Sequence, residues 1–209
     1  MKKLVGKLIL LIVFGLSVVS PAFALPEEAD LAKAVQSYFG EMFQGLKMAA
    51  HQKPTKENFR AIMKPVIDKT EGFYGSTLID SDFVIRQVYK PRNFLAVGYD
   101  LKKVRQLDYF WSEMRKKPAP QLSEPGHGSL LQPRLIAMRY PVLENGQLIG
   151  VVSLMVRTDA FLQATGLDQT QAYRIVCRGQ EAEAKGELGE RYREVRLQLP
   201  STDWLIQYR

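Results

Sequence analysis

Apolar residues occupy both alternations along two neighbouring stretches of the chain, residues 134–143 and 148–156. Strands with this pattern are usually covered on both faces, whereas a strand with one solvent face alternates apolar and polar residues. Asn145 and Gly146 lie between the two stretches. Asn-Gly is a strong signal for a tight β-turn, because both residues adopt positive φ at little cost. The pattern predicts a β-hairpin at the centre of an antiparallel sheet.

The chain before this hairpin begins with a helical period. From Asp30 to about His51, apolar residues recur at steps of three and four, which places them in one stripe along a helix. A second helix is expected from the N-cap residue Thr55 to Gly72, kinked or shortened at Pro65.

Shorter elements complete the pattern. A Pro/Gly-rich connection covers residues 118–134, and the polar segment 179–190 is expected to be a solvated excursion. Helices packed on one side of a single antiparallel sheet make an α+β architecture. The other expected elements are strands at 75–79, 83–89, 173–178, 191–199 and 204–208, and helices at 101–116 and 159–166.

The first 24 residues have the features of a secretory signal peptide. A basic start is followed by an apolar run over residues 8–19 and by the small-x-small site Ala22-Phe23-Ala24. We expect cleavage after Ala24 and a periplasmic or secreted product in which residues 25–209 form one domain. The alternative is an uncleaved N-terminal anchor, although the apolar run is short for a membrane span.

The charge and the cysteine content narrow the function classes. The chain carries +7, but Lys2, Lys3 and Lys7 lie in the signal segment, so the mature chain is close to +4. The basic residues between 102 and 117 are interspersed with acidic ones, which indicates a solvated helix face. We therefore expect no nucleic-acid partner for this exported chain. Cys177 is the only cysteine, so no intrachain disulfide is possible. Its strand-like surroundings predict a buried, inert thiol, and an intermolecular disulfide is the alternative.

No catalytic motif is present. The sequence has no nucleophile elbow, no His-Glu-x-x-His, no phosphate-binding loop and no dinucleotide fingerprint. Its two histidines, His51 and His127, are far apart, so a zinc site is not expected. We predict that the chain is not an enzyme and binds no cofactor or metal.

Two stretches resemble a known family. Residues 109–125, Tyr109-Phe-Trp-Ser-Glu-Met to Pro125, and the hairpin residues 136–152 resemble Cache (PAS-like, PDC) extracytoplasmic sensor domains in their single-Cache form. The closing run Asp203-Trp204-Leu-Ile-Gln-Tyr208 resembles the last strand of that fold. The resemblance implies an antiparallel sheet of five to six strands with a long N-terminal helix packed against it. It also implies a small ligand, such as an organic acid, amino acid or amine, bound between the sheet and a helix-loop cover.

The sequence departs from this family in two respects. It stops at Arg209 without a second membrane span or an output module, so we expect a periplasmic sensor that acts with a membrane-bound signalling partner, or a fragment. In the amino-acid-binding form, an Arg-x-Trp-aromatic run and a later Asp hold the ligand. Those positions hold Leu107, Tyr109, Phe110 and Met155 here, which argues against α-amino acids.

Candidate ligand contacts follow from the expected cover and hairpin. An indole can stack on a ligand, an arginine on a strand can clamp a carboxylate, and a loop histidine can bind an anion. For each there is a structural alternative: Trp111 as core, Arg134 and Arg139 as solvent-facing, and His127 as an exposed loop residue. The predicted ligand-binding residues are Tyr109, Trp111, His127, Arg134, Met138 and Tyr140.

A second function class stays open. The same fold with a filled pocket would make a non-catalytic interaction or structural protein. In that case the amphipathic segment from Leu31 to Leu46 would form a homodimer or dock on a membrane partner.

Overall fold

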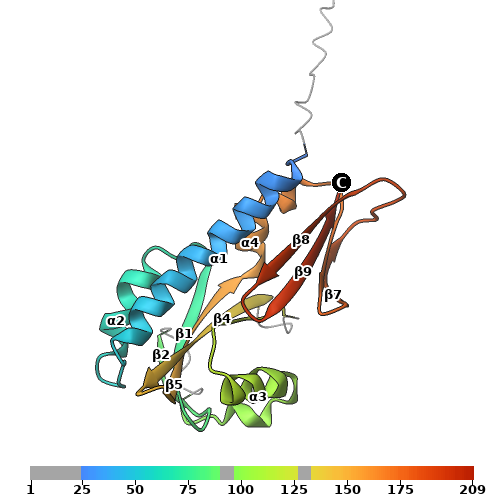
Figure 1. The fold of residues 1–209 in the computed structure, drawn as a ribbon. Helices are drawn as coiled ribbons and strands as arrows, with labels where there is room; N and C mark the ends of the chain where they lie inside the picture. Colours follow the sequence, from blue (N-terminus) through green and yellow to red (C-terminus); the bar gives the residue numbers. More distant parts are fainter. Residues whose placement is uncertain (1–24, 90–96, 127–132) are drawn as a thin grey trace, which may run out of the picture.

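The computed structural model describes residues 25–89, 97–126 and 133–209 (Figure 1). They form two antiparallel sheets, with strand orders β2-β1-β5-β4-β3 and β7-β6-β9-β8. The helices are α1 (Glu28–His51), α2 (Phe59–Ile67), α3 (Asp108–Lys116) and α4 (Thr158–Ala164). The strands are β1 (Phe73–Asp80), β2 (Ile85–Tyr89), β3 (Gln121–Leu122), β4 (Leu135–Glu144), β5 (Gln147–Arg157), β6 (Tyr173–Cys177), β7 (Gln180–Lys185), β8 (Arg193–Leu199) and β9 (Thr202–Tyr208).

The predicted hairpin is the centre of the five-stranded sheet. β4 pairs with β5 in antiparallel register from Leu135↔Arg157 to Glu144↔Gln147. Asn145 and Gly146 both have positive φ, 51° and 79°, as the two-residue turn requires. The prediction of a central hairpin is confirmed, and both of its faces are covered.

The long helix α1 contacts both sheets. It packs against β4 and β5 of the five-stranded sheet and against β8 of the four-stranded sheet (Figure 1). Its apolar stripe, which includes Leu31, Phe39 and Leu46, is buried in one continuous core with side chains from both sheets. The phenol of Tyr208 donates to the carbonyl of Pro26 (2.9 Å), so the two ends of the described chain lie side by side. The predicted α+β fold with a long N-terminal helix against an antiparallel sheet is confirmed.

Three segments differ from the expected pattern. The second helix, α2, begins at Phe59 after the N-cap residue Asn58, not at Thr55, and it ends at Ile67. Residues 101–107 form two 3-10 turns, and the α-helix begins only at Asp108, because the backbone at Val104 is extended. Residues 180–185 are strand β7, not a solvated excursion: Arg178 and Gly179 make a positive-φ turn that returns the chain to pair with β6. The strands after α4 therefore build a second sheet and do not extend the first.

The remaining covering layer lies on the face of the five-stranded sheet opposite α1. α3 packs there (Figure 1), with Trp111 and Met114 in a smaller core beside Ile79, Ile85 and Val151. Within the described residues, none of the helices has the length and apolar content that crossing a bilayer requires.

Candidate functional site

A cavity of about 240 Å³ lies between the five-stranded sheet and its α3 cover. Residues two apart on a strand share a face. One face of β4 and β5 therefore presents Ala137, Arg139, Ser153 and Met155 to the cavity, while the alternate residues pack on α1. Most of the wall is apolar, contributed by Ile79, Ile85, Val88, Leu101, Leu107 and Leu135.

Among the described residues that line the cavity, Arg139 is the one with a charged side chain. Its side chain is buried, with the residue 6% exposed, and its Nη1 has no hydrogen-bond partner among the described residues. The guanidinium carbon lies 4.5 Å from the ring centroid of Phe110 and 5.2 Å from that of Trp111. Burial lowers the pKa of Arg139 to about 10, although the carboxylate of Glu124 acts in the opposite direction. Cation–π contacts offset part of the desolvation penalty of the guanidinium, but they do not give the Nη1 donor a hydrogen-bond acceptor.

Hydrogen-bonding groups accompany this cation. The hydroxyls of Thr77 and Ser153 lie 2.7 Å apart on adjacent strands, and both residues line the cavity. The indole Nε1 of Trp111 is buried without a partner in the part of the chain that the structure describes. None of the described lining residues is Asp or Glu. The cavity therefore offers positive charge and donors in a low-dielectric setting, which suits an anionic group on a small apolar body.

The cover is held to the β1–β2 turn. Trp111 stacks on Phe83, with ring centroids 4.8 Å apart and planes inclined by 27°. The backbone N–H of Leu101 donates to the carbonyl of Phe83 (3.0 Å). Phe83 has a φ of 62°, a left-handed conformation that its complete burial under the cover stabilises.

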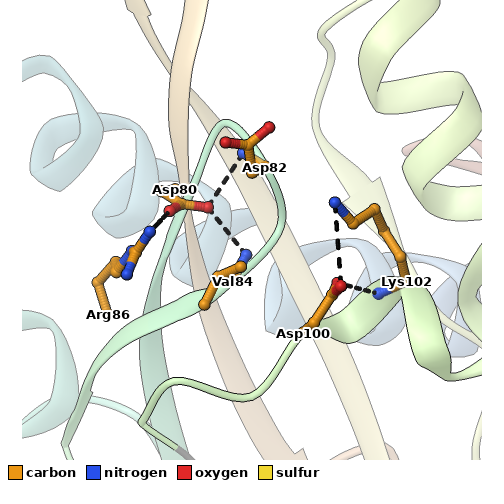
Figure 2. A network of polar contacts seen from close by, with 6 residues as sticks. All are labelled: Asp80, Asp82, Val84, Arg86, Asp100 and Lys102. Carbon is orange, nitrogen blue, oxygen red and sulfur yellow. Dashed lines mark hydrogen bonds and ion pairs between the residues drawn. The ribbon is translucent and has the colours of Figure 1, made fainter.

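The carboxylates near this turn accept hydrogen bonds from backbone N–H groups. Asp80 accepts from the N–H groups of Asp82 and Val84 at 3.0 and 2.8 Å and pairs with Arg86, as Figure 2 shows. Asp100 accepts from the N–H of Lys102 at 3.0 Å. Because these oxygens are already used, the cluster fixes the turn and the start of the cover. In the described ranges, no group of three or more His, Cys, Asp or Glu side chains is placed to hold a metal ion.

The structure brings one of the predicted ligand contacts, Trp111, to the cavity. Met138 and Tyr140 are on the α1 face of β4 and pack in the main core, because the strand alternation gives the cavity face to Arg139. Tyr109 lies outside the cavity lining and is 48% exposed. His127 lies outside the described residues.

Arg134 is engaged elsewhere. Its Nη1 lies 2.5 Å from the buried Glu183 Oε1, and its Nη2 donates to the carbonyl of Ala182 at 3.0 Å. The guanidinium therefore connects the entrance of β4 to β7 and does not line the cavity.

Thr77, Arg139 and Ser153 line the cavity but are not among the ligand contacts predicted from the sequence. The solvent-facing alternative for Arg139 is wrong, because the structure buries this residue. A signal was present for two of the three: Arg139 and Ser153 are polar residues within the apolar stretches 134–143 and 148–156. A polar group at such a position is buried and requires a partner.

A larger hollow of about 800 Å³ is a surface groove between α1 and α2. Its lining includes small or polar residues such as Ala34, Ser37, Gly40 and Gln44. It lacks the combination of a buried cation and unpaired donors found under α3. We therefore take the smaller cavity as the candidate ligand site.

Comparison with known proteins yields a structural likeness. No protein-family model and no curated protein matches the chain. An extracellular ligand binding receptor from Desulfohalobium retbaense aligns over 86% of this chain with a TM-score of 0.65 and 17% identity, and this chain spans 39% of it. The ligand-binding domain of an amino acid chemoreceptor of Pseudomonas aeruginosa, in complex with GABA, aligns over 86% of this chain and 95% of its own length, with a TM-score of 0.61 and 15% identity.

A third similar structure is the periplasmic sensory domain of a Campylobacter jejuni chemoreceptor. It covers 87% of this chain and 91% of its own length, with a TM-score of 0.61 and 12% identity. The chain therefore has the fold of ligand-binding sensor domains, and the resemblance to the Cache (PDC) family is confirmed at the level of the fold.

Proposed function

We propose that this chain is an extracytoplasmic sensor domain that binds a small organic acid between the five-stranded sheet and α3. Arg139 holds the ligand carboxylate, and the apolar wall of the cavity holds the remainder. Thr77, Ser153 and Trp111 supply further hydrogen bonds.

The observation that carries this proposal is the buried guanidinium of Arg139, with an Nη1 that no described residue satisfies. A buried cation without an anionic partner is energetically unfavourable, and ionisable groups perturbed in this way cluster at functional sites. A carboxylate is the natural complement, since it accepts the two parallel hydrogen bonds that a guanidinium donates.

The composition of the lining narrows the ligand class. The comparison structures include complexes with GABA and L-isoleucine, both of which contain a carboxylate and an ammonium group. The described lining residues of this cavity offer no carboxylate for an ammonium group. We therefore propose an organic acid without an amino group, and amines become negative controls.

The N-terminal segment supports a place of action outside the cytoplasm. Residues 1–24 have the pattern of an export signal, and the similar Campylobacter jejuni domain is periplasmic. These features support action outside the cytoplasm. Because the similar domains belong to chemoreceptors, we also propose a membrane-bound signalling partner.

Thermal unfolding with added ligands tests the proposal. Propionate and benzoate should raise the Tm of the wild type, because a ligand that binds only the native state stabilises it. Propylamine should not. Arg139→Met should abolish the shift, while Arg134→Gln, which alters an arginine outside the cavity, should retain it. A wild type that responds to no acid would instead favour a non-catalytic interaction protein with the same fold.

A further inference from the structure

Phe110 links the candidate ligand site to the second sheet. Its ring centroid lies 4.5 Å from the guanidinium carbon of Arg139 and 5.1 Å from that of Arg178. Arg139 belongs to β4 of the five-stranded sheet, whereas Arg178 occupies the β6–β7 turn of the other sheet. Two cations from separate sheets therefore contact one aromatic ring.

Glu124 is the anion beside this pair. Both of its carboxylate oxygens accept from Arg178 Nη2, at 2.7 and 2.6 Å. The backbone on either side of Glu124 is fastened to cavity-lining residues: Ser123 N donates to Ala137 O and Gly126 N donates to Leu135 O, both at 2.8 Å. The Glu124 carboxylate is thus carried on the segment that runs along the cavity strand, close enough to raise the pKa of Arg139 against the effect of burial.

We propose that Glu124 is an internal competitor for Arg139 and that Arg178 holds it away from the ligand site. While the Glu124 carboxylate is paired with Arg178, Arg139 is left to receive the carboxylate of a ligand. Without Arg178, the Glu124 carboxylate loses its ion-pair partner and competes with the ligand for Arg139. Arg178 is therefore a positioning residue, through which the second sheet sets the affinity of the first.

This inference rests on the proposed function, since it concerns the occupancy of Arg139 by a carboxylate. It adds the direction in which the position of the β6–β7 turn is coupled to ligand affinity. Any movement that separates the β6–β7 turn from Glu124 releases the competitor and weakens ligand binding. By linkage, a ligand on Arg139 favours the state in which Glu124 stays on Arg178.

Isothermal titration of propionate and benzoate into the wild type, Arg139→Met and four further variants tests the assignment. Arg178→Ala should bind either acid about fivefold more weakly, the size expected for a partly exposed charge pair. Arg178→Ala combined with Glu124→Gln should regain wild-type affinity, since the competing charge is gone. Glu124→Gln alone should bind as tightly as the wild type or more tightly. Arg174→Ala is the matched control, because Arg174 pairs with Glu181 in the same sheet at 2.8 Å.

The double variant distinguishes two roles of Arg178, holding Glu124 away from Arg139 and packing on Phe110. If the double variant binds as weakly as Arg178→Ala, then Arg178 acts by packing on Phe110, and the inference is overturned. Unchanged affinity in Arg178→Ala, with binding lost in Arg139→Met, overturns it as well and leaves the proposed function intact. If the wild type binds neither acid, both fail. Chemical denaturation of each variant establishes that the titrated protein is folded.

Discussion

Arg134 and Glu183 connect the two sheets through an ion pair of 2.5 Å. Glu183 is nearly buried, with its side chain 6% exposed, whereas the Arg134 side chain is 38% exposed. Arg134 immediately precedes β4, and Glu183 lies on β7. The pair therefore joins two strands between which β5, α4 and β6 lie in the sequence. Removing the cation would leave a buried carboxylate without this partner, which costs more than the pair itself contributes.

Arg134→Met should therefore destabilise the fold by about 1–3 kcal/mol, after allowance for the solvent that screens the exposed arginine. Arg134→Met combined with Glu183→Met should regain most of the loss, because two apolar side chains can replace an ion pair of similar volume. Urea denaturation of the wild type and both variants measures this. Equal losses in the single and double variants would contradict it.

Arg139→Met, unlike Arg134→Met, is not expected to lower the free energy of unfolding. Here the buried charge has no ionic partner among the described residues, and only the cation–π contacts with Phe110 and Trp111 offset its desolvation. Replacement with an unbranched apolar side chain should leave the free energy of unfolding unchanged within about 1 kcal/mol, or raise it. Denaturation in the absence of acids measures this. A loss as large as that of Arg134→Met would indicate that Arg139 is a structural residue.

The central features of the fold could be read from sequence because they are local signals. The Asn145-Gly146 turn, the two-sided apolar strands and the three-to-four spacing along α1 each depend on neighbours a few residues apart. β7 could not be predicted in this way. Gln180–Lys185 is polar, and its Ala182 and Glu183 are buried by partners distant in sequence, including Arg134.

The candidate site was only partly predictable for the same reason. Trp111 follows from the expected cover helix, but the division of β4 between two faces depends on which face receives α1. Met138 and Arg139 are adjacent, so one must lie in the main core and the other under α3. Periodicity alone does not determine which is which, because both alternations of this strand are covered.

Gly150 is a test of the tight packing between β1 and β5. A Cβ at this position would lie 2.8 Å from the carbonyl oxygen of Ile79, a backbone atom that can move only if the strands separate. Gly150→Ala should destabilise by about 2 kcal/mol through overpacking. Gly40→Ala is the control, since a Cβ there meets nothing within 4 Å and α1 gains helix propensity. Thermal denaturation should give opposite signs for the two variants.

Processing of the N-terminal segment is a separate expectation. If residues 1–24 act as a signal peptide, the exported protein begins at Leu25. Intact-mass measurement of protein from the periplasmic fraction checks this directly. Replacing Ala22 and Ala24 with bulky residues should prevent cleavage and leave a longer, membrane-associated product. Full-length wild-type protein in the membrane fraction would instead favour the uncleaved anchor.

Cys177 gives the fold a specific response to alkaline pH. Burial, supported by the nearby Glu124 and opposed by Arg178, raises the pKa of this thiol from 9.0 to about 12. Below pH 9 the thiol is protonated in both states, so it adds no pH dependence. Above pH 9 the unfolded chain releases the proton while the folded chain retains it, and stability is lost until the pH reaches the folded pKa.

Between pH 8 and pH 10 the wild type should lose about 1.4 kcal/mol relative to Cys177→Ala. Urea denaturation at both pH values measures the difference, in which the tyrosine contributions common to both proteins cancel. Parallel pH profiles for the two proteins, or rapid thiol labelling of the native wild type at pH 8, would show that the thiol is not buried as described.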